Sequence, residues 1–501
     1  MRYTSTRDSS VNVPFETAVL SGISPSDGGL YVPCEWPTAN SASFAPGLSY
    51  GDVAHRLVRL FVHSGEVSDE EIDRVVRDSS APFADPNEPV HLTWLSQQLV
   101  VLELWHGPTL SFKDVAMQFV LQMQQLFLQR DKGIKRRRTL LVATTGDTGA
   151  AAIHAARSVP EVECFVLYTR GRVTPRQELQ MLQPDEPNVH AVSVPVTSDE
   201  LDVVLRRLFA DGPFAEQYAL STVNSFNWAR VMYQAVYYIW AYLKVNNSGS
   251  NNVTFVVPSG GFGNGFAAVL ARHVLGQGAA FKIVGATNAN DILVRLLAKG
   301  DGLLSVTGTV RPTLSSCMDI MVPSNLERLV YFAALTCPDP SISSTAAQLT
   351  GDLMVSLTTS NSTTAALPDQ LRRRIAGLCS FTSVDDDATA ATVASVARSF
   401  KYLVDPHTAV AVHAANSLMS DDAGVVVCCS TASPAKFIDT VTAAAGRSVL
   451  LPANAHVDKV LLEHLVATRA LKAESIDETE TLLRRLIAAR FVKAFERQKS
   501  L

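Results

Sequence analysis

Residues 252–275 read NVTFVVPSGGFGNGFAAVLARHVL, and this stretch decides the fold class. An apolar, β-branched run ends at Pro258, a glycine-rich turn follows, and a longer apolar pattern comes next. The first run predicts a buried strand, and the last predicts a helix that starts directly after the turn. Glycines let such a turn bend sharply and aim its N–H groups at one point, where the helix N-terminus adds positive potential. The turn therefore suits a phosphate group, although a tight turn without a ligand has the same pattern.

The turn matches neither of the two common nucleotide fingerprints. No GK[ST] follows it, so it is not a P-loop. The dinucleotide pattern GxGxxG also fails, because Gly261 and Gly263 fit but Phe266 stands in the third place. A phosphorylated ligand other than a nucleotide fits this turn better.

The same rhythm of strand, turn and helix recurs along the chain. Further strands are predicted at 139–145, 164–169, 189–196, 282–287 and 424–430. Nearly continuous apolar strands that alternate with helices predict an α/β protein whose parallel sheets are covered on both faces. Ligands bind such sheets at the edge where the strands end.

We expect three domains. Residues 1–95 are rich in Pro, Ser and Asp and predict an N-terminal domain packed on the core. A smaller α/β domain is expected at 96–240 and a larger one at 241–501. The Ser/Thr-rich stretch 340–370 favours a mobile insertion over a pair of polar capping helices. The basic run 132–138 favours a solvated loop over a binding patch.

Composition excludes several classes of protein. The 501 residues are 47% hydrophobic and 18% charged, with a net charge of −5, which argues against a nucleic-acid partner. No run of about 18 apolar residues predicts a membrane span, and the polar start lacks the apolar core of a signal peptide. Seven cysteines without a CxxC pair favour a reduced compartment. We therefore expect a cytoplasmic protein.

Lys113 is the candidate nucleophile. It lies in LWHGPTLSFKDVAMQF (104–119), behind a Gly-Pro turn and at the mouth of an apolar helix. Apolar surroundings disfavour the charged form of a lysine, and a neutral amine forms Schiff bases with carbonyls. Taken alone, the window is more typical of a surface lysine at a helix start.

Three further turns carry groups that suit a small anionic ligand. The turn TTGDTG (144–149) offers hydroxyls and N–H groups to a carboxylate, or caps a helix through Asp147 or Thr148. The stretch STASPAK (430–436) puts hydroxyls at a strand end, where they contact a ligand or cap the chain reversal. The stretch NSFNWAR (224–230) places an arginine one helical turn from amides, as an anion contact or in a structural pair.

Other catalytic motifs are absent from the sequence. It contains no HExxH, no GxSxG and no clustered Cys/His set, so no metal site is predicted. His407 has no partner at a spacing typical of metal ligands, and we expect it in a turn or behind the groups that touch a ligand.

Six segments together resemble threonine synthases and occur in the order seen in that family. They are 104–119, 144–152 (TTGDTGAAA), 259–268 (SGGFGNGFAA), 318–329 (MDIMVPSNLERL), 404–410 (VDPHTAV) and 430–437 (STASPAKF). The opening segments MRYTSTR (1–7) and FETAVLSGISPSDGGLYVP (15–33) also resemble the family's N-terminus. The likeness is spread over most of the chain, and residues 340–370 lie outside it.

The resemblance implies an enzyme that uses pyridoxal 5'-phosphate (PLP) and has the tryptophan-synthase β-subunit fold, PLP fold type II, with the cofactor between two α/β domains. Lys113 would carry PLP as a Schiff base, and Thr431 would face the pyridine nitrogen. The residues implied to bind the phosphate of PLP are Gly260, Gly261, Phe262, Gly263 and Asn264. The turn implied to hold the substrate carboxylate consists of Thr144, Thr145, Gly146, Asp147 and Thr148. The candidate contacts to the substrate phosphate are Ser225, Asn227 and Arg230.

Three positions depart from the family's usual pattern. Gly261 stands where the phosphate loop commonly has Asn, and Thr145 stands where Ser is common. Both changes are mild, because a glycine N–H donates equally well. Ser433 replaces the usual His of a TAHPAKF motif and puts any role of that imidazole in doubt.

The implied reaction converts O-phospho-L-homoserine and water to L-threonine and phosphate, the last step of threonine biosynthesis. Lys113 would both tether the cofactor and remove the Cα proton. The alternative is a related phospho-lyase that releases phosphate and 2-oxobutyrate. A third hypothesis, a non-catalytic protein that binds a phosphorylated ligand, conflicts with the retention of Lys113, the glycine turn and Thr431. We expect a monomer or homodimer.

Overall fold

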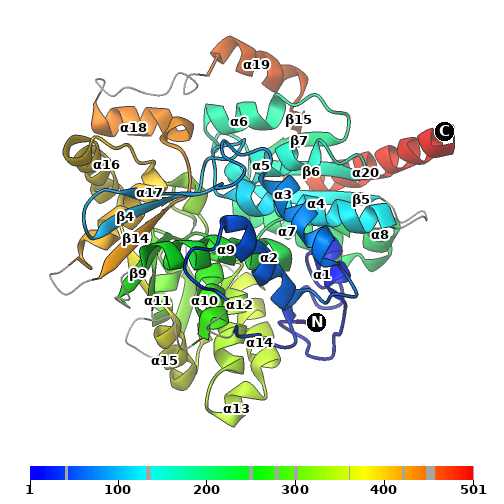
Figure 1. Cartoon of the computed structure of the whole chain (residues 1–501). Helices are drawn as coiled ribbons and strands as arrows, with labels where there is room; N and C mark the ends of the chain where they lie inside the picture. Colours follow the sequence, from blue (N-terminus) through cyan, green and yellow to red (C-terminus); the bar gives the residue numbers. More distant parts are fainter. Residues whose placement is uncertain are drawn as a thin grey trace.

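The computed structural model describes residues 1–39, 43–130, 137–246, 252–276, 281–297, 303–307, 309–359, 362–419, 424–446 and 457–499. All six strands predicted above are present, and they divide between two sheets that lie apart in Figure 1. The α/β fold class with parallel sheets is thereby confirmed.

The smaller sheet is fully parallel and has the strand order β15-β7-β6-β5-β8. Its strands are β5 (Arg138–Thr144), β6 (Val162–Thr169), β7 (Val189–Val194), β8 (Leu220–Ser221) and β15 (Leu471–Lys472). Successive residues of β5 alternate between two hydrophobic clusters: Leu140 joins the one that includes α5 (Asp147–Ala156), and Leu141 joins the one that includes α7 (Ser198–Ala210). Because strand side chains have a period of two, helices on both faces require an unbroken apolar run.

The larger sheet has the order β13-β10-β9-β14-β4-β3, and only the pair β3–β4 is antiparallel. Its strands are β3 (His91–Trp94), β4 (Leu99–Glu103), β9 (Val253–Pro258), β10 (Phe281–Thr287), β13 (Ser380–Ser383) and β14 (Val425–Ser430). In β9, Phe255 belongs to the cluster that includes α10 (Gly263–Leu275), and Val256 belongs to the one that includes α17 (Pro406–Asn416). This sheet is therefore also covered on both faces.

The two sheets cross the expected domain boundaries. β3 and β4 lie in the larger sheet, although the boundary at 95 falls between them and 96–240 was expected to form the smaller domain. β15, from the C-terminal part, pairs with β7 of the smaller sheet. After β4 the chain leaves the larger sheet through α4 (Lys113–Arg130), so the lysine segment joins the two sheets. The division at 95 and 240 stays a prediction.

The N-terminal part packs against this body. It contains β1 (Tyr3–Ser5), α1 (Phe15–Ser21), β2 (Tyr31–Pro33), α2 (Tyr50–Phe61) and α3 (Asp69–Ser80). Helix α2 contacts α9 (Trp228–Val245), and α3 contacts α4. The buried carboxylate of Glu327 accepts hydrogen bonds from Thr6 Oγ1 at 2.6 Å and from Arg7 Nε at 2.9 Å. A buried ion pair with several hydrogen bonds thus anchors the N-terminus.

The stretch 340–370, described except for residues 360 and 361, differs from the favoured expectation and is nearer to the alternative of a helix pair. Instead of a mobile insertion it contains α13 (Pro340–Ser343), α14 (Ala346–Thr359) and β12 (Ser362–Ala366). Helix α14 contacts α12 (Leu326–Leu335), and β12 pairs antiparallel with β11 (Leu303–Thr307). The buried side chains of Leu353, Met354 and Leu357 explain the order, because they place an apolar stripe of α14 in the core. Of the basic run 132–138, residues 132–136 lie outside the described ranges.

The other helices complete the layers around the sheets. They are α6 (Pro175–Leu182), α8 (Gly212–Gln217), α11 (Ile292–Leu297), α15 (Asp369–Leu378), α16 (Asp386–Phe400), α18 (Ile438–Ala445), α19 (Lys459–Thr468), α20 (Ile476–Lys499), and the 3₁₀ helices η3 (Ser316–Met318) and η4 (Pro434–Phe437). Across the described ranges, none of the helices combines the length and hydropathy that crossing a membrane requires.

Candidate active site

A cavity opens where strands of both sheets end. Lys113, at the first position of α4, lies on its wall, together with residues that follow β5, β9 and β14. The sequence-predicted residues that line the cavity are Lys113, Thr144, Thr145, Thr148, Ser225, Arg230, Gly260, Gly261, Phe262, Gly263, Asn264 and Thr431. The structure thus brings most of the candidate residues to one place.

The backbone fixes Lys113 next to Thr431. The N–H of Phe112 donates to the carbonyl of Thr431 at 2.8 Å, and the N–H of Ser433 donates to the carbonyl of Leu110 at 3.0 Å. These bonds join two turns that are far apart in the sequence. Leu110 has a φ of 62°, a left-handed conformation that is costly for leucine and persists because the surrounding hydrogen bonds hold the turn.

The helix that starts at Lys113 is held from its other side by Asp114. This buried carboxylate accepts hydrogen bonds from the N–H of Thr109 at 2.8 Å and from Thr109 Oγ1 at 2.7 Å. Burial raises the pKa of Asp114 to about 6, against the lowering effect of these bonds and of Lys436. Position 107 must be glycine, because a Cβ there would lie 2.6 Å from the Cβ of Asp114.

The glycine turn forms a narrow cradle at the start of α10. Phe262 has a φ of 61° and precedes the helix, and within the described part of the chain no side-chain cap hydrogen bond satisfies the first N–H groups of α10. A Cβ at Gly260 would lie 2.9 Å from the Cα of Met318, and one at Gly263 would lie 2.9 Å from the Cβ of Ser225. This backbone path therefore requires glycine at positions 260 and 263, and the uncapped N–H groups suit an anion.

Several buried polar atoms of the lining residues lack a hydrogen-bond partner among the described residues. They are Asn264 Nδ2, Arg230 Nε, Gln234 Oε1 and Asn224 Oδ1. Burial lowers the pKa of Arg230 to about 10, so its guanidinium stays charged at neutral pH. Buried polar groups are normally hydrogen-bonded, so four such atoms around one cavity indicate a polar ligand.

The TTGDTG turn divides into two parts. Thr144, Thr145 and Thr148 line the cavity, and Thr144 Oγ1 accepts hydrogen bonds from the N–H groups of Gly146 at 2.8 Å and Gly149 at 3.0 Å. Gly146, with a φ of 133°, and Asp147 are not among the lining residues. The carboxylate of Asp147 instead lies between two lysine ammonium groups, so it is not a contact for a substrate carboxylate.

Asn227 does not lie where the sequence placed it. It caps α9 through its side-chain oxygen, and its amide donates to the carbonyls of Val19 at 2.8 Å and Thr222 at 3.1 Å. It is fully buried and does not line the cavity, so a contact with the substrate phosphate is excluded in this geometry. An N-cap and an anion contact use the same residue type, which is why the sequence did not separate them.

Ser433 lies outside the cavity, whereas His407 lines it, which reverses the expectation for the two residues. Ser433 caps η4, where its Oγ accepts from the N–H of Ala435 at 3.3 Å, and it does not line the cavity. His407, in the first turn of α17, does line it. Its Nε2 accepts from the N–H of Cys317 at 3.1 Å, so Nδ1 carries the proton toward Asp405 Oδ2, 2.5 Å away. The imidazole in this cavity therefore comes from the VDPHTAV segment.

Sequence reasoning also missed Cys317, Asp199 and Asp202 on the cavity wall. Burial raises the pKa of Asp202 to about 7, and Asp199 accepts from the N–H of Met321 at 3.2 Å. No motif marks these acids, because they lie on an ordinary amphipathic helix.

Within the described ranges, no three His, Cys, Asp or Glu side chains are grouped so that they could hold a metal ion.

Family models match nearly the whole chain. The model for the threonine synthase N terminus matches residues 2–80, the model for PLP-dependent enzymes matches 87–367, and the model for the threonine synthase C-terminal part matches 408–481. The second match runs through most of 340–370, so the expectation that this stretch lies outside the family likeness was wrong.

Individual relatives agree with the family models. Threonine synthase of Schizosaccharomyces pombe is 36% identical over 464 residues, covering 88% of this chain and 89% of its own. Threonine synthase-like 2 of Homo sapiens is 35% identical and covers 93% and 92%. The PLP-bound threonine synthase crystal structure from Brucella melitensis superposes with a TM-score of 0.81 at 35% identity, covering 97% of this chain and 99% of its own. The chain therefore belongs to the threonine synthase family, PLP-dependent lyases of PLP fold type II.

Proposed function

We propose that this protein is a threonine synthase, which converts O-phospho-L-homoserine and water to L-threonine and phosphate. One observation carries the proposal: Lys113, the glycine turn and Thr431 border a single cavity that also holds the unpaired buried atoms of Asn264 and Arg230. A lysine, an anion cradle and a hydroxyl are the three contacts that PLP needs in this fold.

The residues present fit the cofactor. The N–H groups from Gly260 to Asn264 would hold its phosphate at the uncapped N-terminus of α10, and Asn264 Nδ2 has a free donor there. Thr431 would place a hydroxyl at the pyridine nitrogen, and Lys113 would hold the carbonyl carbon. When bound, PLP supplies an electron sink for negative charge that develops on substrate carbons.

Four further lining residues would contact the two charged ends of the substrate. The hydroxyls of Thr145 and Thr148 would bind the carboxylate, and Ser225 and Arg230 would bind the phosphate that leaves. Lys113 Nζ would remove the Cα proton and return protons to the substrate carbons. Asp147, 3.4 Å from Nζ, would keep the amine aimed at the cavity.

Replacing Arg230 by glutamine should raise the KM for O-phospho-L-homoserine about tenfold, because a charge-assisted hydrogen bond of about 1.5 kcal/mol is lost. Steady-state kinetics would measure this, and cofactor absorption would show that PLP is retained. The control is Arg157→Gln, which removes only a surface ion pair with Glu186. An unchanged KM would remove Arg230 from the phosphate site.

The alternative is elimination of phosphate with release of 2-oxobutyrate. The chain is 36% identical to a relative named threonine synthase and 35% identical to one named threonine synthase-like 2, so sequence identity does not separate the two reactions. Incubation of the PLP-loaded protein with O-phospho-L-homoserine separates the two by product: threonine supports the proposal, and 2-oxobutyrate as the main product contradicts it. A monomeric or homodimeric state and a cytoplasmic location stay predictions.

A further inference from the structure

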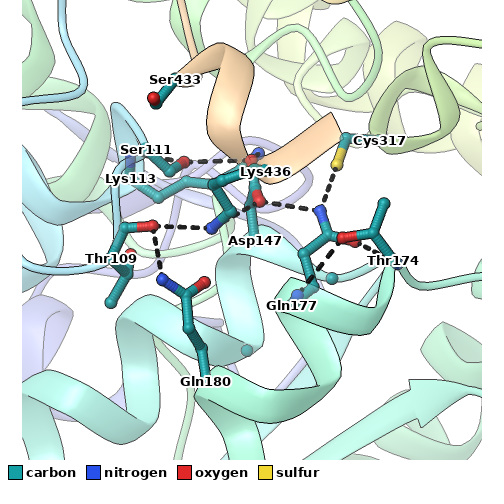
Figure 2. Close-up of polar contacts among 12 residues, drawn as sticks. Thr109, Ser111, Lys113, Asp147, Thr174, Gln177, Gln180, Cys317, Ser433 and Lys436 are labelled. Atoms are coloured by element: carbon teal, nitrogen blue, oxygen red, sulfur yellow. Dashed lines mark hydrogen bonds and ion pairs between the residues drawn. The ribbon is translucent and has the colours of Figure 1, made fainter. Parts of the chain in front are cut away.

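A buried carboxylate lies between two lysines beside the cavity. Asp147, at the start of α5, has Oδ2 3.4 Å from Lys113 Nζ and Oδ1 2.9 Å from Lys436 Nζ. The side chains of Asp147, Lys113 and Lys436 are 2%, 13% and 0% exposed. Figure 2 shows both ammonium groups directed at the one carboxylate.

Neutral groups complete the shell around Asp147. Ser111 Oγ donates to its Oδ2 at 3.1 Å, and Gln177 Nε2 donates to its Oδ1 at 2.8 Å (Figure 2). Burial alone would raise the pKa of Asp147, but Lys436 and Lys113 together hold it well below its usual range. Asp147 is therefore ionised at any pH at which the protein works.

Lys436 is fixed in its place. It belongs to η4, is fully buried, and donates a second hydrogen bond from Nζ to the carbonyl of Thr109 at 2.8 Å. That carbonyl belongs to the turn that leads into Lys113 and also accepts from Gln180 Nε2 at 3.1 Å (Figure 2). Lys436 thus bridges the lysine turn and Asp147, although it is not itself one of the residues that line the cavity.

The cluster of Lys113, Lys436 and Asp147 contains two positive charges and one negative charge when Lys113 is protonated. Two ammonium groups face one carboxylate, so the ion pair of Lys436 and Asp147 stays neutral when Lys113 gives up its proton. Without Lys436, the loss of that proton would leave Asp147 as a buried, uncompensated anion, and such an anion strongly favours a protonated lysine next to it. The free amine of Lys113 is the form that attacks a carbonyl or accepts a proton.

We propose that Lys436 is a positioning residue for Lys113: its ammonium neutralises Asp147, so that Asp147 can orient the Lys113 amine without holding it protonated. This inference rests on the assignment of Lys113 as the residue that takes up PLP. Other charged or titratable groups also face this region and are the same in every variant considered below: Asp114 on α4, Asp199 and Asp202 on α7, Arg230 on α9, Cys317 on η3, and His407 on α17.

The test measures how the reaction of Lys113 with PLP depends on pH. Full-length protein freed of cofactor is mixed with PLP at a series of pH values and reduced with borohydride, and mass spectrometry gives the modified fraction of Lys113. In Lys436→Met, the pH of half-maximal modification should rise by about one unit or more, because the uncompensated Asp147 retains the proton of Lys113. Asp147→Asn should shift it downward. The double variant leaves no anion beside Lys113 that would retain its proton. Its midpoint should therefore return toward the wild-type value by more than half of the shift seen in Lys436→Met.

Lys282→Met is the matched control, because Lys282 is exposed on β10, and its midpoint should equal that of the wild type. An unshifted midpoint in Lys436→Met, with a wild-type circular dichroism spectrum, overturns the proposal. If Lys436→Met does not fold, the test rests on Asp147→Asn and the double variant. A midpoint in Asp147→Asn that is unshifted or shifted upward then overturns the proposal. If wild-type Lys113 is modified at no pH, the role of Lys113 in the proposed function fails instead. The readout requires no substrate, so it is independent of whether threonine or 2-oxobutyrate is formed.

Discussion

Replacing Lys113 by alanine should lower the rate of phosphate release from O-phospho-L-homoserine by at least about a thousandfold. A positioned acid–base group alone contributes about 10²–10⁴-fold, and this variant also loses the covalent attachment of PLP. Lys113 is the one lysine among the described residues that line the cavity, and the hydrogen bonds from Phe112 N–H to the Thr431 carbonyl and from Ser433 N–H to the Leu110 carbonyl fix its turn. Borohydride reduction followed by mass spectrometry should find the cofactor attached to residue 113 in the wild type and not in the variant.

Lys282→Ala provides the control for this substitution, since it removes an exposed lysine that does not line the cavity. It should retain full activity and the attached cofactor. A Lys113→Ala protein with normal turnover would contradict the mechanism, whatever the state of its cofactor.

Replacing Gly260 by alanine should weaken PLP binding by about 10- to 100-fold. The added Cβ would lie 2.9 Å from the Cα of Met318, which is backbone and cannot move like a flexible side chain. Relieving such a contact costs about 1–3 kcal/mol and displaces the N–H groups that face the phosphate. A titration of cofactor-free protein with PLP, followed by absorbance, gives the dissociation constant.

Gly377→Ala is matched to this change, because a Cβ at that position in α15 meets no atom within 4 Å. Its PLP affinity should equal that of the wild type. Equal PLP affinity in the Gly260→Ala protein would show that the phosphate lies elsewhere.

The strands could be predicted from the sequence because both sheets are buried on both faces. Six apolar runs gave six strands, and the pattern around Pro258 gave the turn before α10 correctly. β4 (Leu99–Glu103) was not predicted, although all its residues are buried, because the preceding polar region obscured a run of only five residues. A helix pair at 340–370 was only the less favoured alternative, since the serines and threonines of α14 concealed the apolar stripe that packs on α12.

The site was predictable where one local turn performs one task. The glycine turn and Lys113 are of this kind, and both lie on the cavity wall. Contacts between distant segments leave no local pattern, so the pairing of Lys436 with Asp147 and the entry of His407 into the cavity became visible only in the structure. For the same reason Ser433 drew attention as a missing imidazole, whereas it is a buried cap.

The most direct test of the central claim traces the oxygen atom of water into the products by isotope labelling. The PLP-loaded protein is incubated with O-phospho-L-homoserine in H₂¹⁸O, and both products are analysed by mass spectrometry. A threonine synthase breaks the Cγ–O bond and adds water at Cβ, so threonine should carry one ¹⁸O in its hydroxyl group and the phosphate released should be unlabelled. Homoserine with labelled phosphate, or 2-oxobutyrate without threonine, would contradict the assignment.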